Sequence, residues 1–379
     1  MSEVANIPQL RFPGFSDEWE ERPLKDVSTF FNGKAYKQAE LLSSGKYPVL
    51  RVGNFFTNNS WYYSNLELDE NKYCDNGDLL YAWSASFGPR IWAGEKVIYH
   101  YHIWKVINHS QVTKKFLFIV LDNETAKMKA QSANGFALLH ITKGTIENWK
   151  INLPTRQEQQ KIAAFLTAVD SKIEQLSKKK ALLGEYKKGL MQQIFSQAIR
   201  FKADDGSDFP NWEEKKLGDI LDYEQPTNYI VDSTEYDNSF DMPVLTAGKS
   251  FVLGYTNETH KVFENIPVII FDDFTTANKY VDFPFKVKSS AMKILKPKDS
   301  FVNIRLIFEF IQMLNFPIGE HKRYWISEYQ DLKIPFPSFE EQTKIASFLS
   351  SIDNKIEQVG KQLDESKQFK KALLQQMFV

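Results

Sequence analysis

The sequence lacks the features that mark secreted or membrane proteins. It has one cysteine, Cys74, among 379 residues, which excludes an internal disulfide framework. The N-terminal MSEVANIPQL carries an acid and no apolar signal-peptide core, and the longest apolar runs, such as residues 116–121, are far shorter than a bilayer span. We therefore expect a soluble protein of the cytoplasm with no membrane partner.

Motifs for catalysis or cofactor binding are also missing. We find no P-loop, no glycine-rich fingerprint after a strand, and no D/N-P-P-Y/F motif that would position an amino group for methylation. Cys74, His100 and His102 include two imidazoles on one predicted strand face, but they lack a fourth ligand at a recognisable spacing. We expect no catalytic site, no metal and no cofactor bound by this chain.

An excess of positive charge, the usual signal of nucleic-acid binding, is absent from the chain as a whole. The formal net charge is -1, from 47 basic and 48 acidic residues. The charge is distributed unevenly, however: residues 19–153 hold 16 basic against 13 acidic residues, 154–200 hold 9 against 4, 212–336 hold 14 against 19, and 337–379 hold 6 against 6. Because phosphate binding depends on local clusters of lysine and arginine, the total neither proves nor excludes it.

A stretch of about 40 residues occurs twice, 183 positions apart, and the rest of the chain is organised around it. Both copies follow the pattern P-x-x-x-EQ-x-KIA-x-FL-x-x-x-D-x-KIEQ, which starts at Pro154 and again at Pro337. A capping box opens each copy, Thr155 to Glu158 and Ser338 to Glu341, in which hydroxyl and carboxylate each accept from a free amide. The repeat predicts two equivalent long helices.

Apolar residues recur in both helices at alternating spacings of four and three. This 3.5-residue period is typical of a coiled coil, and the length exceeds that of ordinary surface helices, so we expect the two copies to pair with each other. The predicted pairing seam consists of Ile162, Leu166, Val169, Ile173, Leu176, Leu183, Leu190, Ile345, Leu349, Ile352, Ile356, Val359, Leu363 and Leu373.

The repeat extends into the segments before the helices. Residues 19–27, WEERPLKDV, correspond to 212–220, WEEKKLGDI, and Pro48-Val49-Leu50 corresponds to Pro243-Val244-Leu245. The predicted boundaries are a first globular domain with its N-terminal segment at 1–153, a helix at 154–200, a linker at 201–211, a second globular domain at 212–336 and a second helix at 337–379.

Each globular domain is predicted to be α+β, with short strands and one helix. Strands are expected at residues 27–31, 47–52, 79–83 and 97–106 of the first domain and at 268–271 and 286–295 of the second. Helices are expected at 113–131 and 303–314. Because the linker is short and the first helix carries the chain some ~60 Å, pairing requires the second helix to run back antiparallel. We expect a pseudo-two-fold arrangement, which suits a partner with two half-sites such as duplex DNA.

The repeated helix motif and the two introductory stretches, LRFPGFSDEWEERPLKDV and DFPNWEEKKLGDI, resemble the specificity subunits of type I restriction-modification systems over essentially the whole chain. The resemblance implies a non-catalytic DNA reader. In that family each target-recognition domain reads one half of a bipartite, asymmetric DNA site, and the helices space the halves. It also implies two modification subunits that methylate adenine with S-adenosylmethionine, through which restriction subunits using ATP and Mg are recruited.

Side chains that can read bases should lie on loops and carry donors and acceptors, with arginine or lysine suited to guanine and asparagine or glutamine suited to adenine. The candidates in the first domain are Lys34, Tyr36, Lys37, Arg51, Asn54, Ser84, Ser86, Arg90, His140 and Lys143. Those in the second are Thr246, Lys249, Thr275, Thr276, Asn278, Lys279, His321, Lys322, Arg323 and Tyr324. Asp272 and Asp273 could accept from cytosine or face solvent, and each candidate could equally be an ordinary surface residue.

Two other classes of function stay open. The chain could be a coiled-coil interaction scaffold whose domains bind protein or glycan. It could also be an enzyme that acts directly on nucleic acid, since Asp208, Glu213 and Lys215 outline a D…E-x-K cluster. Arg22 takes the place of Lys215 in the equivalent motif, and a solvated linker explains the acids as well.

Overall fold

The structure, a computed structural model, describes residues 6–56, 58–84, 87–132, 141–246, 250–317 and 323–378. The chain divides into two compact units. Unit 1 comprises Met1–Leu176 and Gln362–Val379, and unit 2 comprises Ser177–Lys361. Each unit therefore contains one globular domain together with parts of both long helices.

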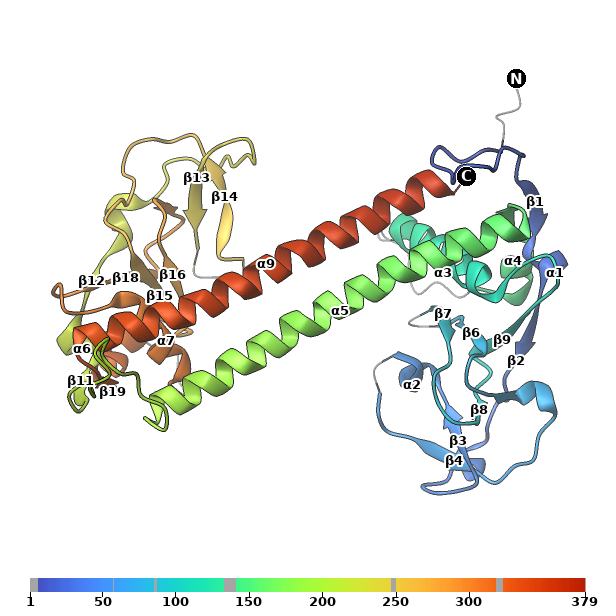
Figure 1. Cartoon of the computed structure of the whole chain (residues 1–379), viewed down its shortest axis with the longest axis horizontal. Helices are drawn as coiled ribbons and strands as arrows, with labels where there is room; N and C mark the ends of the chain where they lie inside the picture. The colour runs from blue at the N-terminus through green and yellow to red at the C-terminus, as the bar shows by residue number, and fades with distance from the viewer. Residues whose placement is uncertain are drawn as a thin grey trace. The chain divides into compact units, whose positions relative to one another are not determined.

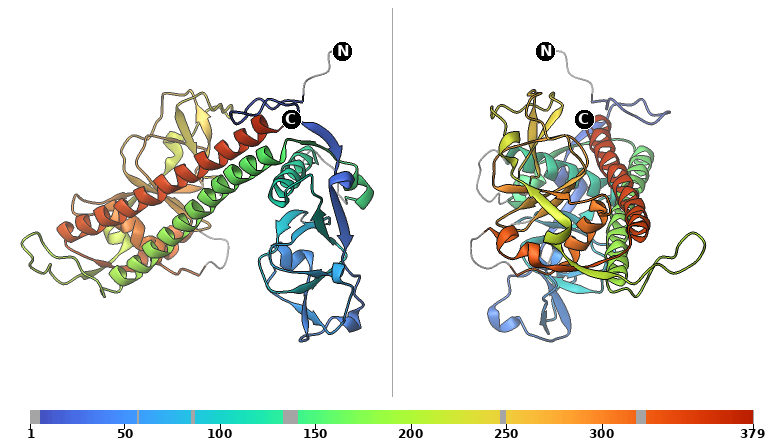
Figure 2. Two further views of the ribbon diagram at one scale, coloured as in Figure 1. Left: turned by 45° about the vertical axis from the view of Figure 1, so that its right-hand side comes forward. Right: turned by 90° about the vertical axis from the view of Figure 1, so that its left-hand side faces the viewer.

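The long helices are α5 (Arg156–Phe195) and α9 (Phe339–Met377), and they run antiparallel as predicted. In unit 1 the beginning of α5, at Ile162, shares a core with the end of α9, at Leu373. In unit 2 the end of α5, at Ile194, shares a core with the beginning of α9, at Ile345. Within each unit the green α5 and the red α9 lie side by side (Figures 1 and 2).

The seam residues are all buried or half-buried, and none is exposed. Charged residues at repeat-equivalent positions bridge the helices in both units: Lys370 lies 2.7 Å from Asp170, and Lys187 lies 2.8 Å from Asp353. Lys180 falls at the four-three spacing between the seam residues Leu176 and Leu183 although it is not apolar, and it passes over Gly360, where an added Cβ would come within 3.0 Å of its Nζ. A glycine at this point of α9 makes room for the lysine.

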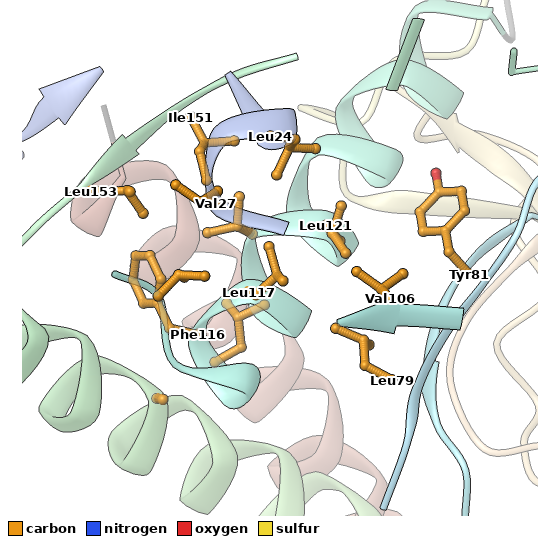
Figure 3. Packing of buried hydrophobic residues seen from close by; sticks show 14 of the residues in the cluster. Leu24, Val27, Leu79, Tyr81, Val106, Phe116, Leu117, Leu121, Ile151 and Leu153 are labelled. Carbon is orange, nitrogen blue, oxygen red and sulfur yellow. The ribbon is translucent and has the colours of Figure 1, made fainter. Parts of the chain in front are cut away.

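The globular domain of unit 1 is built on two four-stranded sheets, ordered β2-β9-β6-β7 and β4-β3-β8-β5, with β1 paired to β10. Its elements are β1 (Glu20–Pro23), α1 (Leu24–Val27), β2 (Ser28–Asn32), η1 (Gln38–Glu40), β3 (Tyr47–Leu50), α2 (Val52–Phe56), β4 (Tyr62–Ser64), η2 (Glu70–Lys72), β5 (Tyr73–Cys74), β6 (Leu79–Ala82), β7 (Gly88–Ile91), β8 (Val97–Tyr99), β9 (Ile103–Asn108), α3 (Lys114–Ser132), α4 (Lys143–Glu147) and β10 (Lys150–Leu153). In the core, Leu117 and Leu121 of α3 meet Val27 of α1 and Val106 of β9 (Figure 3).

The globular domain of unit 2 repeats most of this order; among the described residues it lacks counterparts of α2, η2 and β5 and adds η4. Its sheets are β12-β18-β15-β16 and β14-β13-β17, and β11 pairs with β19. The elements are β11 (Glu213–Lys216), α6 (Leu217–Ile220), β12 (Leu221–Glu224), η3 (Pro226–Tyr229), β13 (Met242–Leu245), β14 (Val252–Thr256), β15 (Val268–Asp272), β16 (Asn278–Val281), β17 (Lys286–Val287), β18 (Met292–Pro297), α7 (Ile304–Met313), α8 (Tyr324–Ser327), η4 (Tyr329–Asp331) and β19 (Lys333–Phe336). The first and central strands keep the same register, since Phe30 faces Val106 in unit 1 and Tyr223 faces Leu295 in unit 2.

Two strands that the sequence predicts as continuous are interrupted. Residues 97–106 form β8 and β9, which belong to different sheets, and residues 286–295 form β17 and β18 in the same way. Between β8 and β9 the chain turns tightly, because the amide of Ile103 donates to the His100 carbonyl at 2.9 Å. The prediction that His100 and His102 share one strand face is therefore wrong, because both lie in the turn.

Only half of each predicted capping box forms. The Glu158 and Glu341 amides lie 3.4 Å from the Thr155 and Ser338 hydroxyls. The carboxylates turn to arginines instead. Glu158 accepts two hydrogen bonds from Arg11 at 2.7 and 2.8 Å, and Glu341 accepts from Arg200 at 2.7 Å. These carboxylates are fully buried, so the segment before each domain is attached to the start of a long helix by a buried ion pair.

The glutamine of the repeated EQ pair attaches the globular domain to the helix. The Gln159 side chain accepts from the Thr113 amide at 2.9 Å and donates to the Gln111 carbonyl at 2.9 Å. Gln342 binds the amide of Asn303 at 2.8 Å and the carbonyl of Phe301 at 3.2 Å in the same way. Since these backbone groups precede α3 and α7, the motif fixes each domain's helix against a long helix.

The N-terminal segment of unit 1 takes the place that the linker takes in unit 2. The Leu10 amide donates to the Gln376 carbonyl of α9 at 2.9 Å, and the Ile199 amide donates to Gln193 of α5 at 3.2 Å. Two residues after each of these amides, a phenylalanine packs edge-on against a long helix: Phe12 on Phe165 of α5 in unit 1, and Phe201 on Phe348 of α9 in unit 2. The end of α9 therefore completes unit 1, as the end of α5 completes unit 2.

Candidate nucleic-acid interface

Gly33 brings the first candidates of unit 1 against the turn between β8 and β9. The Lys34 amide donates to the Tyr99 carbonyl at 3.0 Å. A Cβ at Gly33 would lie 2.3 Å from the carbonyl oxygens of both Tyr99 and His100, so only glycine permits this approach. Tyr36 then stacks on the His100 ring, with centroids 6.3 Å apart.

The side chains of this loop differ in their surroundings. Lys34 Nζ lies 3.3 Å from the Glu40 carboxylate and 5.6 Å from the Tyr36 ring centroid. The Tyr36 hydroxyl is buried and has no hydrogen-bond partner among the described residues, and burial raises the pKa of Tyr36 above its ordinary value. Lys37 is exposed. The loop thus places Lys34 beside a half-buried aromatic ring and leaves Lys37 exposed.

Arg51, Asn54 and Arg90 gather around α2. The Arg51 guanidinium lies 4.3 Å from the centroid of the Tyr62 ring and donates to Asn54 at 3.3 Å. Asn54 donates from its amide to the carbonyls of residues 58 and 60, which holds the following loop. Arg90, on β7, lies 5.1 Å from the ring of Phe56 at the end of α2.

The other described candidates of unit 1 are less available to a ligand, because one is buried and one is paired. Ser84 is buried, and Lys143, exposed on α4, pairs with Glu147 at 3.5 Å. Ser86 and His140 lie outside the described residues.

The β8–β9 turn, residues 100–102, contributes no residue to the sequence-based candidates for DNA contact. His100 contacts Lys34 through an isolated bridge and Tyr36 through ring stacking, so it joins candidates that are distant in sequence. Burial, with the neighbouring charges of His102 and Arg51, lowers the pKa of His100 to about 4, so its ring is neutral at neutral pH. The signal that could have revealed the turn was the clustering of His100, Tyr101 and His102 beside a glycine-dependent loop.

In unit 2 the predicted residues 275–279 and 323–324 come together. The Tyr324 amide donates to the Asp273 carbonyl at 2.8 Å, which seats α8 on the β15–β16 loop. Arg323 is exposed, whereas Tyr324 is buried in the core. Thr275 and Lys279 are exposed; Thr276, with a left-handed φ of 57°, and Asn278 are half-buried. Thr246 lies apart on the loop after β13, and Lys249, His321 and Lys322 are outside the described residues.

Asp272 and Asp273 are buried and bind within the protein, so neither faces solvent as the sequence allowed. Asp272 accepts from the amides of Phe274 at 2.8 Å and Thr275 at 3.2 Å, which shapes the loop. Asp273 accepts from the Trp325 amide at 3.0 Å and lies 3.4 Å from the buried Lys293 ammonium. Part of the negative charge of the second domain is therefore neutralised inside it.

Other acids of unit 2 are neutralised in the same manner. Glu258 lies 2.7 Å from the fully buried Lys286, and Glu309 lies 2.9 Å from both Lys187 and Arg305. Asp232, Glu258 and His260 come close enough to hold a cation, with ligand atoms within 4.8 Å, but Lys286 and Lys261 already occupy their carboxylates. Because these pairs, apart from Lys187–Glu309, join acids and bases of the same domain, they leave its excess of acidic residues unchanged.

The three residues that outline a nuclease cluster form two separate ion pairs. Asp208 pairs with Lys202 at 3.3 Å, and Lys215 pairs with Glu213 at 3.3 Å while lying over the Phe336 ring. Both pairs are solvent-exposed, which matches a solvated linker and strand.

Each unit has a groove between its globular domain and a long helix. The groove of unit 1 measures about 670 Å³ and that of unit 2 about 970 Å³. Four repeat-equivalent helix positions line both grooves: Thr167, Asp170, Ser171 and Glu174 in unit 1, and Ser350, Asp353, Asn354 and Glu357 in unit 2. The opposite walls carry basic side chains, among them Lys115 and Lys129 in unit 1 and Arg305 and Lys296 in unit 2.

Two copies of one protein-family signature account for most of the sequence. The model of the type I restriction modification DNA specificity domain matches residues 16–184 and again 210–366. The chain belongs to the family of type I restriction-modification specificity subunits. Its two matches each include a globular domain and much of the long helix that follows it.

Individual members of this family resemble the chain to different extents. The specificity subunit of the type I restriction enzyme EcoR124I/EcoR124II from Escherichia coli is 49% identical over 141 residues, which cover 36% of this chain and 35% of that protein. The MjaVIII specificity subunit from Methanocaldococcus jannaschii is 25% identical over 402 residues, covering 96% and 92%. The strong match is thus confined to about a third of the chain.

Solved structures of specificity subunits share the fold. The alignment with the S subunit of a type I restriction-modification system from M. genitalium covers 98% of this chain and 99% of that chain, with a TM-score of 0.68 and 17% identity. A chain from a study of type I R-M complex assembly gives a TM-score of 0.51 at 17% identity. Among the described residues of this family member, no helix is long and apolar enough to cross a bilayer.

Proposed function

We propose that this chain is the non-catalytic DNA-reading subunit of a type I restriction-modification complex. Each globular domain reads one half of a bipartite, asymmetric site, and the helices α5 and α9 space the halves. The observation that carries the proposal is the repetition itself, in which one scaffold occurs twice with different surface side chains. A partner with two unlike half-sites requires that combination.

The same repetition supports the docking of two modification subunits. The grooves at residues 167–174 and 350–357 present the same helix positions to solvent twice, so one type of partner can bind at both. These partners would carry S-adenosylmethionine and methylate adenine. Restriction subunits, with ATP and Mg, would join the complex through them.

The candidate loops support DNA as the ligand in physical terms. Lys34, Arg51 and Arg90 place cations beside aromatic rings in unit 1. Lys37 is exposed in the same unit, and Lys279 and Arg323 are exposed in unit 2. Such cations bind phosphates and position a protein on the duplex, whereas polar and aromatic side chains contact base edges.

Transfer of labelled methyl groups from S-adenosylmethionine to DNA tests this assignment. We expect no transfer by the chain alone, because it has no motif for methyl transfer, and site-specific transfer when the modification subunit is added. The modification subunit alone is the control, and its product should lack the bipartite motif. Methyl transfer by the isolated chain would contradict the non-catalytic role.

A further inference from the structure

We propose that the turn of residues 100–102 is the base-reading element of the first domain, and that residues 288–291 hold the same place in the second. The inference rests on the proposed function, that each domain reads half of a DNA site. Neither turn contains any of the residues that the sequence suggests as candidates for DNA contact.

The two turns are equivalent by backbone register. The His100 amide donates to the Leu50 carbonyl at 2.9 Å, and the Lys288 amide donates to the Leu245 carbonyl at 2.8 Å. In both domains the turn follows the strand that pairs in parallel, β8 with β3 and β17 with β13, and leads into the central strand of the other sheet. The turns therefore sit where the two sheets of each domain join.

Stacked aromatic rings from the core pack against the first turn. Tyr81 and Trp104 are buried and stack at 6.0 Å, and Trp83 stacks on Trp104 at 5.8 Å with the planes 20° apart. Trp83 in turn meets the His102 ring edge-on at 4.9 Å and donates from Nε1 to the Tyr101 carbonyl at 2.8 Å. The turn is thus held in one conformation before any ligand arrives, which lowers the entropic cost of binding.

The side chains of the first turn have the chemistry that base edges require. Because His100 Nδ1 accepts from the His102 amide at 3.5 Å, the neutral ring carries its proton on Nε2, which can donate to a purine N7. Tyr101 is 38% exposed, and its ring lies between those of His100 at 4.5 Å and His102 at 3.9 Å. Lys34 and Arg51 flank the turn and can hold the adjoining phosphates.

The second turn has a different chemistry on the same backbone. Lys288, Ser289 and Ser290 follow β17 where His100, Tyr101 and His102 follow β8. Lys288 Nζ lies 5.9 Å from the Tyr236 ring, so an aromatic ring again neighbours the turn. By contrast, the glutamines that attach the domains to the helices, Gln159 and Gln342, are the same in both repeats. Constant attachment with variable turns is what readers of two unlike half-sites need.

The test uses the full chain in complex with its modification subunit. The variants are His100→Ala/Tyr101→Ala, Tyr101→Ala alone, Lys288→Ala, and Lys127→Ala on the exposed surface of α3 as a matched control. Methylation-sensitive sequencing and competition with single-base-pair variants of the site report the discrimination at each position. We expect discrimination in one half-site to fall about tenfold to a hundredfold for the turn variants of unit 1, and in the other half for Lys288→Ala.

The possible results distinguish a wrong assignment of the turns from a wrong proposed function. Lys127→Ala should match the unaltered chain. Unchanged discrimination at every base pair in both Tyr101→Ala and Lys288→Ala, with both proteins folded, overturns the assignment of the turns. If the unaltered complex methylates no bipartite motif, the proposed function itself is wrong. Should the double variant unfold, the two single variants still decide, because Tyr101 is partly exposed and Lys288 is half-buried.

Discussion

Replacing Leu373 and Met377 of α9 with alanine should unfold unit 1 at a lower denaturant concentration while leaving unit 2 nearly intact. Both side chains are at least 95% buried, in the core that contains Trp19, Phe116 and Ile162. Truncating a buried leucine or methionine costs about 2–5 kcal/mol, so the pair should lower the free energy of unfolding of unit 1 by about 4–10 kcal/mol. Hydrogen exchange followed by mass spectrometry would locate the loss of protection.

The repeat supplies a matched control for this experiment. Leu190 and Ile194 of α5 occupy the equivalent positions, and Ile194 belongs to the core of unit 2. Leu190→Ala/Ile194→Ala should therefore destabilise unit 2 and spare unit 1. In the antiparallel pairing, the end of α9 packs in unit 1 beside the start of α5, and the end of α5 packs in unit 2 beside the start of α9. Equal loss of protection in both units for either variant would contradict that pairing.

Replacing Arg11 with methionine should destabilise unit 1 strongly, because it leaves the Glu158 carboxylate buried without its cation. Glu158 is fully buried, and its two oxygens accept from Arg11 at 2.7 and 2.8 Å. Breaking a buried ion pair from one side costs about 3–5 kcal/mol. Urea unfolding of the full chain, with hydrogen exchange to resolve the start of α5, measures the loss.

Two further variants isolate the charge from the packing. Arg11→Met/Glu158→Met removes both charges and should recover most of the stability, since apolar replacements of a buried ion pair are often neutral or stabilising. Arg200→Met, the equivalent change in unit 2, should cost less, because Glu341 keeps a hydrogen bond from Trp212 at 2.7 Å. A double variant as unstable as Arg11→Met would show that the arginine acts through packing rather than through the carboxylate.

The helix pair and the order of domains were predictable because they depend on a repeated local pattern. Apolar residues at alternating intervals of four and three fix the faces of α5 and α9, and the short linker fixes their direction. The partners of Glu158 and Gln159 were not predictable in the same way. The sequence correctly indicates a helix start at the EQ pair, but a carboxylate near a hydroxyl could bind the local amide or a distant arginine, and only the fold brings Arg11 to it.

The surroundings of the candidate DNA-contacting residues were predictable only in part, for a similar reason. Lys34 and Tyr36 lie beside His100 because Gly33 allows a close approach of the two segments, and their contact with DNA stays a prediction. The strand predicted over residues 97–106 concealed the β8–β9 turn, since β-branched and aromatic residues continue through it without a glycine or proline. Tyr324 and Asp273, polar in type, are in fact buried. The Asp273 carboxylate accepts from the Trp325 amide and lies beside the buried Lys293, and the Asp273 carbonyl accepts from the Tyr324 amide.

The central claim, that each domain reads one half of a DNA site independently, is tested most directly by exchanging one domain. Residues 212–336 would be replaced with the second domain of another specificity subunit, and both long helices would be kept. Methylation-sensitive sequencing of DNA from cells that express the exchanged chain with its modification subunit then reports the motif. We expect one half of the motif to change and the other half to persist; a change in both halves, or in neither, would contradict the account.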